Sequence, residues 1–272
     1  MMQDIQISII TACFNHGTYL EENIHSIQTY KWKIPVEHII INDGSTDQFT
    51  IDKLAQLKAK GNNIIDQKNA GPANARNKGI AASSGKYILP LDADNKLRPA
   101  IFEKAFTLME KEQNVAVVYT NAMCFGDMNY LWEPGEIDPY KFLVTNYLDT
   151  CSLIRKSELI EVGGYDDKIP VHGNEDWDLW LKMIFAGKGF YYLKEIGYEY
   201  RVLTNSLSRT ESTPKQQIIN EYIARKYAVE YAIHYSGLFS EKKKLENLKS
   251  FLKQHKLKSI LKIILNKSLI DY

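Results

Sequence analysis

The sequence predicts an α/β fold with a mostly parallel central sheet flanked by helices, followed by a helical C-terminal tail. Two observations predict it. In the first 120 residues, short apolar runs alternate with segments of helical periodicity, joined by short loops. After Pro214 the sequence has a helical pattern throughout. Such alternation is typical of a parallel sheet that is covered on both faces.

The first 120 residues are expected to contain five strands and four helices. Pro72 and Pro99 lie near the first turns of two helices, where proline is tolerated. Ser45 or Thr46 is expected to cap another helix. The expected elements are strands at residues 5–12, 36–43, 63–67, 86–92 and 115–120, and helices at 19–28, 45–60, 71–83 and 98–112.

The pattern becomes less regular after residue 120. Residues 121–150 mix aromatic and turn residues, which indicates an insertion or an acceptor-side loop. A strand, a short helix and a turn at Gly163–Gly164 follow, then a helix over 174–189 and two late strands. We expect a domain over residues 1–212, with a nucleotide-binding half (1–120) and an acceptor half (121–212), and a helical extension over 213–272.

Composition limits the class of protein. The three cysteines are odd in number and form no C-x-x-C, which favours a reducing, cytoplasmic setting. No apolar run approaches the roughly 20 residues of a membrane span. Residues 241–272 carry nine lysines and three acids, net +6, while the remainder carries 25 basic and 30 acidic residues, net −5. The body is therefore not expected to bind nucleic acid.

Two acids, Asp92 and Asp94, directly follow the fourth expected strand in YILPLDADN. Their like charges repel unless a cation lies between them or a proton is shared. Asp and Asn are also common in turns, so the pattern alone indicates little more than a turn. Their acceptor oxygens suit a hard cation such as Mg²⁺ or Mn²⁺, which also binds diphosphate oxygens.

Polar clusters follow the other early strands too, in TACFN, NDGSTD and NAGPANARN. Ligands bind at the carboxyl ends of parallel strands, where these loops gather. Asp43 is expected to accept from a base N–H, Phe14 to stack on a base, and Arg76 to supply charge for a diphosphate. The sequence therefore predicts a site for a nucleoside diphosphate and a metal. It has neither a P-loop motif nor a G-x-G-x-x-G after the first strand.

Five motifs in this order, TACFN, NDGSTD, NAGPANARNKG, LDADN and GNEDWDLWLK, resemble glycosyltransferase family 2 over about residues 5–205. The resemblance implies a GT-A fold and inverting transfer of a sugar from a UDP-sugar, with Asp94 as metal ligand. It implies that Ala12, Phe14 and Asp43 hold the uracil and that Asp92 faces the ribose. The expected nucleotide-binding residues are Thr11, Ala12, Phe14, Asn15, Asp43, Asn69, Arg76, Asp92, Ala93 and Arg201.

The resemblance also assigns the acceptor side. It implies that Asp176 is the general base, with Glu175 and Trp177 in support, although acids at the start of a helix also serve the helix dipole. Backbone N–H groups there are expected to keep Asp176 ionised. Residues 200–208 (YRVLTNSLS) are similar to a late family segment, Y-R-x-H-x-x-S-x-S, but have Leu203 where a histidine is usual.

Other functions compete with this one. An aspartyl phosphohydrolase usually places D-x-D on the first strand, and a nucleotidyltransferase usually has a Gly-rich basic loop after it; neither pattern is present. A non-catalytic nucleotide-sugar-binding protein would be expected to lack one of the carboxylates, and all of them are present.

The C-terminal tail is expected to form a basic amphipathic helix. Apolar residues recur near helical spacing beside lysines in residues 241–272. This face either lies on an anionic membrane or packs on the catalytic domain or a second subunit. We expect a cytoplasmic protein, peripheral on the membrane in the first case, that acts on a glycan, lipid-linked or protein acceptor in cell-surface polysaccharide synthesis.

Overall fold

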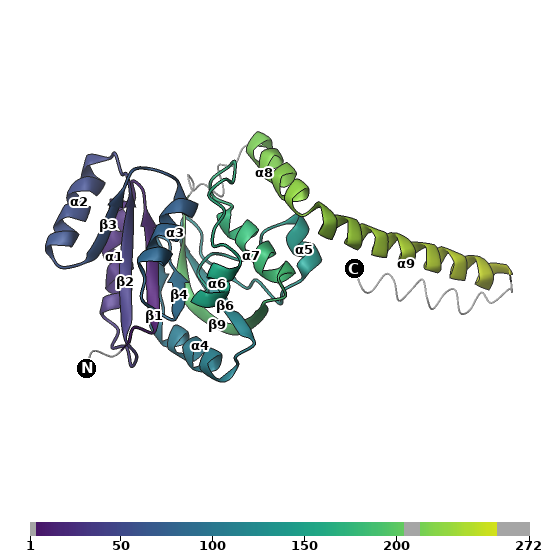
Figure 1. Ribbon diagram of the computed structural model, residues 1–272, viewed down its shortest axis with the longest axis horizontal. Helices are drawn as coiled ribbons and strands as arrows, with labels where there is room; N and C mark the ends of the chain where they lie inside the picture. The colour runs from purple at the N-terminus through teal and green to yellow at the C-terminus, as the bar shows by residue number, and fades with distance from the viewer. Residues whose placement is uncertain (1–3, 204–212, 255–272) are drawn as a thin grey trace. The chain divides into compact units, whose positions relative to one another are not determined.

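The computed structural model describes residues 4–203 and 213–254, and residues 4–203 form one mixed sheet with helices on both faces (Figure 1). The strands are β1 (Ile7–Cys13), β2 (Val36–Asp43), β3 (Asn63–Gln67), β4 (Tyr87–Pro90), β5 (Lys96–Leu97), β6 (Val115–Gly126), β7 (Tyr130–Trp132), β8 (Leu153–Arg155) and β9 (Gly189–Val202). The helices are α1 (Gly17–Gln28), α2 (Gln48–Ala59), α3 (Pro72–Ala82), α4 (Pro99–Lys111), α5 (Pro139–Val144), α6 (Lys156–Glu161), α7 (Glu175–Phe185), α8 (Thr213–Lys226) and α9 (Ala228–Gln254).

The sheet has the order β3-β2-β1-β4-β8-β6-β9-β5, with β7 paired to β6. Strands β1 to β4 are parallel to one another. Strand β8 is antiparallel to both β4 and β6, so β6 and its parallel partner β9 run in the same direction as the first four strands. The carboxyl ends of these strands therefore point to the same edge of the sheet.

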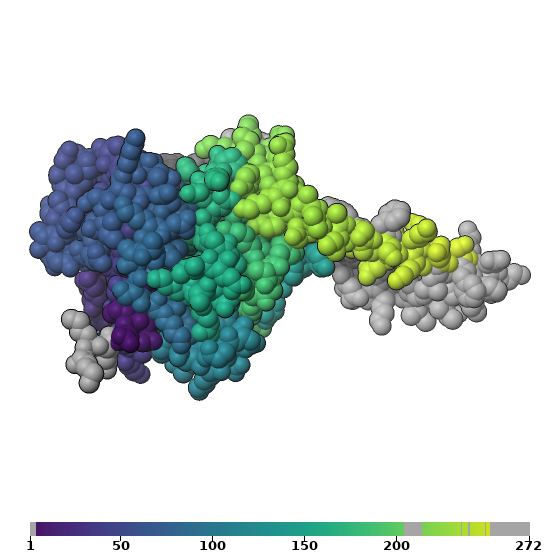
Figure 2. Space-filling view, in the orientation of Figure 1, coloured from purple at the N-terminus to yellow at the C-terminus, as the bar shows by residue number. Residues whose placement is uncertain are grey.

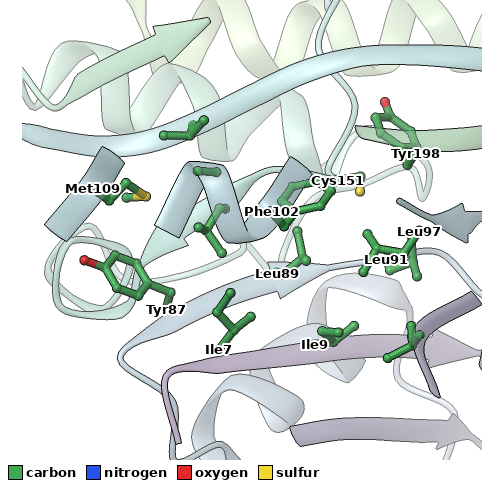
Figure 3. Close-up of a cluster of buried hydrophobic side chains, with 14 of the residues drawn as sticks. Ile7, Ile9, Tyr87, Leu89, Leu91, Leu97, Phe102, Met109, Cys151 and Tyr198 are labelled. Atoms are coloured by element: carbon green, nitrogen blue, oxygen red, sulfur yellow. The ribbon is translucent and has the colours of Figure 1, made fainter. Parts of the chain in front are cut away.

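Both faces of the sheet are covered, as the alternating sequence predicts. On one face, Ile7 and Ile9 of β1 and Leu89 of β4 join Phe102 and Met109 of α4 in a buried cluster (Figure 3). In a second buried cluster, apolar residues of α1 and α2 pack against Ile40 of β2. Helix α3 lies close to β1 and β2 on the other face, where Gly79 leaves room for the side chain of Ile10.

Two expectations about local structure needed correction. Helix α2 is capped by Asp47, which accepts from the N–H groups of Phe49 and Thr50, and not by Ser45 or Thr46. The Ser45 hydroxyl is used elsewhere, since it accepts from the N–H of Asn15. The two late strands are one continuous strand, β9.

The chain divides into two compact units, Met1–Ile223 and Ala224–Tyr272. The predicted domain boundary at residue 212 lies outside the described residues, and the division falls within α8. In the first unit, the atoms of residues 4–120 lie directly against those of residues 121–202 (Figure 2). The second unit contains α9, on which Val229, Ile233 and Leu238 are exposed. Within the described ranges no helix is long and apolar enough to cross a bilayer.

Candidate active site

Asp92 and Asp94 lie on a turn at the carboxyl end of β4. The strand ends at Pro90, and the N–H of Asn95 donates to the carbonyl of Asp92 at 3.0 Å, which closes the turn. Burial and the neighbouring charge of Asp92 raise the pKa of Asp94 to about 6. The second acid of the pair therefore lacks a sufficient positive partner within the protein.

Arg76 lies between the Asp92 turn and helix α7. Its Nη2 is 2.8 Å from Oδ1 of Asp92, and its Nη1 is 3.6 Å from Oε2 of Glu175. The guanidinium also lies over the ring of Tyr165, and the side chain is only 10% exposed. Burial acts to lower the pKa of Arg76, but Asp92, Tyr165 and Glu175 hold it above its ordinary value. Arg76 therefore joins the first acid of the turn to α7.

Asp43, at the end of β2, holds the loop that leads into α3. Its Oδ1 accepts from Nε2 of Gln67 at 2.7 Å and from the N–H of Ala70 at 2.9 Å. Its Oδ2 accepts from the N–H of Gly71 at 2.9 Å. Although Asp43 is only 3% exposed, Oδ2 retains lone-pair capacity for a base N–H. The chain turns sharply at Gly44, with φ +67°.

A Cβ on Gly44 would lie 2.6 Å from the backbone nitrogen of Asn69. Glycine therefore lets the loop that contains Asn69, a predicted nucleotide-binding residue, come close to the end of β2.

The loop after β1 presents Phe14, which is 43% exposed, and Ala12, near the end of β1 itself, is half-buried. Asn15 has φ +56°, and its Oδ1 accepts from the N–H groups of Thr46 and Asp47, so it ties this loop to the one after β2. Thr11 is fully buried and its hydroxyl bonds to Nε2 of His38 at 2.9 Å. Thr11 thus lies in the sheet below the loop, and Ala93 is buried as well.

The N-terminus of α7 carries Glu175 and Asp176 in different environments. Burial acts to raise the pKa of Glu175, but His172, Arg76 and the N–H of Gly173 together hold it below its usual value. Burial, the charge of Asp149 and the charge of Glu175 raise the pKa of Asp176 to about 8. The expectation that the helix N-terminus keeps Asp176 ionised is therefore wrong, because burial and neighbouring acids outweigh the helix.

Trp177 and Trp180 fix α7 in place. Both are buried, and the Nε1 atoms donate to the carbonyls of Phe142 at 2.5 Å and Leu148 at 3.1 Å. Trp177 therefore supports the start of the helix, beside Asp176, from within the core.

Asp149 is a buried acid that the sequence pattern did not predict as a site residue. Its Oδ1 accepts from the N–H of Cys151 at 2.9 Å, and it bonds to the side chain of Tyr198. Burial and the charge of Asp92 raise its pKa to about 7. Because β8 runs antiparallel to β4, the residues before β8 lie beside those after β4. That pairing, which the sequence did not predict, was the missing signal.

Arg201, on β9, contacts the Asp92–Asn95 turn. Its side chain is 12% exposed, and its Nε donates to the carbonyl of Asp94 at 3.0 Å. Leu203 is half-buried, and residues 204–208 of the YRVLTNSLS segment lie outside the described residues.

The acids of the turn fit a divalent cation that arrives with a ligand. Among the residues that the structure describes, no group of three or more His, Cys, Asp or Glu is arranged to hold a metal ion. Asp92 is paired with Arg76, which leaves Asp94 as the main candidate. Mg²⁺ is commonly bound through one or two carboxylates together with substrate phosphates, and this donor set matches that pattern.

Comparison with known proteins places these features in a family. The family model described as Glycosyl transferase family 2 matches residues 8–195. An uncharacterized glycosyltransferase of Methanocaldococcus jannaschii is 26% identical over 229 residues, which are 79% of this chain and 77% of that protein. TuaG of Bacillus subtilis, whose name assigns it to teichuronic acid biosynthesis, is 26% identical over 211 residues, 74% of this chain and 81% of TuaG.

The fold is also found among solved structures. Residues 1–349 of TarS from S. aureus, crystallised with UDP-GlcNAc, align with a TM-score of 0.64 at 16% identity, over 83% of this chain and 66% of that one. The same TarS fragment has been crystallised with UDP. The expected α/β fold of GT-A type is thereby confirmed.

Proposed function

Because the chain belongs to glycosyltransferase family 2, we propose that it transfers a hexosyl or hexosaminyl group from a UDP-sugar to a hydroxyl of a glycan, lipid-linked or protein acceptor, with inversion. The observation that best supports this proposal is the arrangement of acids around Arg76, with Asp92 on one side and Glu175, at the start of α7, on the other. The TarS structures with UDP and UDP-GlcNAc support the choice of donor. The relation to TuaG supports a role in cell-surface polysaccharide synthesis.

On the donor side, we assign the base to the loop around Ala12 and Phe14 together with Asp43. Phe14 offers an exposed ring for stacking, and Asp43 has one acceptor position left. Asp92 faces the ribose in this assignment, and Asp94 would hold Mn²⁺ or Mg²⁺. When bound, the cation supplies positive charge beside the leaving diphosphate.

On the acceptor side, we assign Asp176 as the general base. The acceptor oxygen forms a bond to the anomeric carbon, the bond from that carbon to the diphosphate oxygen breaks, and the acceptor proton passes to Asp176. A base works best when its pKa lies near the working pH, and the pKa of Asp176 is about 8. Glu175 is a weaker candidate because Arg76, His172 and the N–H of Gly173 already engage its carboxylate.

The test is a UDP-release assay with a panel of UDP-sugars, in which water serves as acceptor, in Mn²⁺ and in EDTA. We expect release from at least one donor in Mn²⁺ and loss of release in EDTA. Proton NMR of the released sugar should show the inverted anomer first, before mutarotation. Tight donor binding without any turnover, even with glycan acceptors added, would instead favour a non-catalytic nucleotide-sugar-binding protein.

We further assign the segment from residue 241 onward to an anionic membrane surface. Five of its nine lysines, Lys242 to Lys244, Lys249 and Lys253, lie on α9, and residues 255–272 lie outside the described residues. Lysines near such a surface each contribute roughly 1 kcal/mol. Deleting residues 241–272 should release the protein from anionic vesicles at low salt. An intact protein that ignores these vesicles would instead favour packing on the catalytic domain or a second subunit.

A further inference from the structure

The turn that carries Asp92 and Asp94 is held by helix α1. Asn23 of α1 is fully buried, and its Nδ2 donates to the carbonyls of both Asp92 and Asn95, each at 3.0 Å. The two hydrogens of one side-chain amide thus hold both ends of the turn. Since it has no exposed surface, Asn23 has no route to touch a donor itself.

The same face of α1 holds the chain that follows the turn. Ser26 lies three residues after Asn23, which places both side chains on one side of the helix. Its Oγ accepts from the N–H of Leu97 at 2.9 Å. Helix α1 therefore fixes residues 92–97 through hydrogen bonds to backbone atoms at three positions.

Arg201 holds the turn from β9. Its Nε donates to the carbonyl of Asp94 at 3.0 Å, and its backbone N–H donates to Oδ1 of Asn95 at 2.8 Å. The guanidinium contacts two aromatic rings, 4.5 Å from the centroid of Tyr19 and 4.4 Å from that of Phe125.

Nη2 of Arg201 is also 2.8 Å from Oε2 of Glu22 on α1. The arginine that binds the turn is therefore itself held by two aromatic rings and by an ion pair.

Such support meets a specific need of this turn. Asp92 and Asp94 are two residues apart and repel each other, and residues 92–95 lie outside the ladders of β4 and β5. A site that receives a ligand through charged oxygens must hold them within about 0.5 Å of the productive geometry. The side chains of Asn23 and Arg201 donate to backbone carbonyls of the turn. They thus keep the two carboxylates near each other and leave the carboxylate oxygens of Asp92 and Asp94 for other partners.

We propose that Asn23 and Arg201 are positioning residues that fix the 92–95 turn so that Asp92 and Asp94 receive a cation-bound nucleoside diphosphate. The inference rests on the proposed function, because it takes UDP with Mn²⁺ as the ligand of this turn. It assigns Arg201 a role through the backbone of Asp94, in addition to any contact with the nucleotide.

The test compares Asn23→Ala with Ser8→Ala. Ser8 is also fully buried and also holds a turn, since its Oγ accepts from the N–H of Gly85 at 2.8 Å before β4 begins. UDP affinity is measured by calorimetry in Mn²⁺ and in EDTA, below the melting temperature of both variants. Asn23→Ala should weaken Mn²⁺-dependent UDP binding by at least tenfold, and Ser8→Ala should leave it within twofold of wild type.

A second pair covers the case in which Asn23→Ala does not fold. Arg201→Lys keeps the charge but loses the Nε bond to Asp94, and Arg155→Lys is its control. Arg155 is a buried arginine over the ring of Tyr87, and it donates to the carbonyls of Met109 and Val115, remote from the turn. Only Arg201→Lys should weaken Mn²⁺-dependent UDP binding.

A double variant with Asp94→Ala shows whether Asn23 acts on UDP binding through the turn or only supports the fold. If Asn23 acts through the turn, adding Asn23→Ala to Asp94→Ala should change UDP affinity by less than twofold. Equal UDP binding by wild type, Asn23→Ala and Arg201→Lys would overturn the inference and leave the proposed function intact. Absence of Mn²⁺-dependent UDP binding in the wild type would overturn the proposed function, and the inference with it.

Discussion

The acids at the two sides of Arg76 differ in how fully the protein itself satisfies them. On the donor edge (Asp43, Asp92 and Asp94), Asp43 accepts three hydrogen bonds and Asp92 is paired with Arg76. On the acceptor side (Asp149 and Asp176), burial and neighbouring acids raise the pKa values to about 7 and about 8. The raised pKa values of Asp149 and Asp176 favour their protonated forms, whereas Asp43 and Asp92 have hydrogen-bond or ion-pair partners within the protein.

Asp94 is the exception on the donor edge, and it sharpens the comparison. Burial and the charge of Asp92 raise its pKa to about 6, whereas Asp43 and Asp92 have dedicated partners. An acid that lacks a partner in the protein is expected where the ligand supplies one. In the proposed function, a bound cation would be this partner for Asp94, and Asp176 would take the proton of the acceptor hydroxyl.

The largest effect is expected from Asp94→Ala, which removes the proposed metal ligand from the donor edge. Divalent-dependent UDP binding and sugar transfer should both be lost while the fold is kept, since removing Asp94 also removes its repulsion with Asp92. Calorimetry in Mn²⁺ and a UDP-release assay measure the two. Asp66→Ala is a matched control, because Asp66 is an exposed acid near the end of β3, which pairs with β2 and not with β4. Full activity of Asp94→Ala, or of the wild type in EDTA, would contradict the assignment.

A smaller effect is expected from Asp149→Asn, which removes one of the charges that raise the pKa of Asp176. The acidic limb of the pH profile of kcat/KM should move to lower pH, by about one unit or less, because the base then ionises more easily. Asp52→Asn, an exposed acid on α2, should leave the profile unchanged. A limb that stays in place, or moves to higher pH, would show that Asp149 does not act on the base.

The smallest effect concerns stability. Free carboxyls titrate near pH 4, whereas the pKa values of Asp94, Asp149 and Asp176 are about 6, 7 and 8. Between about pH 4 and about pH 8, these three sites therefore bind more protons in the folded protein than in the unfolded chain. Its stability should therefore fall as pH rises through this window.

Melting curves at pH 5.5 and 8.5 check this directly. Tm should be lower at pH 8.5, by about 2–4 °C for each kcal/mol lost, and Asp176→Asn should reduce the difference. A Tm that rises between these pH values would mean that the acids of the site are not held protonated.

The two sides also differ in how far the sequence predicted them. The donor edge follows from local pattern, because Asp43, Asp92 and Asp94 each follow an apolar run that ends a strand. The acceptor side depends on pairing between distant segments: Asp149 reaches Asp92 only because β8 inserts antiparallel between β4 and β6. Periodicity identified β8 as a strand but carries no information about its neighbours.

Burial explains the remaining error. The sequence places Asp176 at a helix N-terminus, which favours an ionised acid, but it does not reveal that Asp149 and Glu175 lie nearby. Likewise, Arg76 is a helix arginine in the sequence, and only the structure places it between Asp92 and Glu175.

The division of roles between the two sides is tested most directly by measuring UDP affinity and sugar transfer in Asp176→Asn. Asparagine keeps the volume of the side chain but cannot take a proton. UDP affinity in Mn²⁺ should stay within about threefold of wild type, while transfer at saturating donor falls by about two or more orders of magnitude. Glu175→Gln, measured in parallel, should retain more transfer than Asp176→Asn. Transfer that survives in Asp176→Asn and is lost in Glu175→Gln would contradict the assignment of the base.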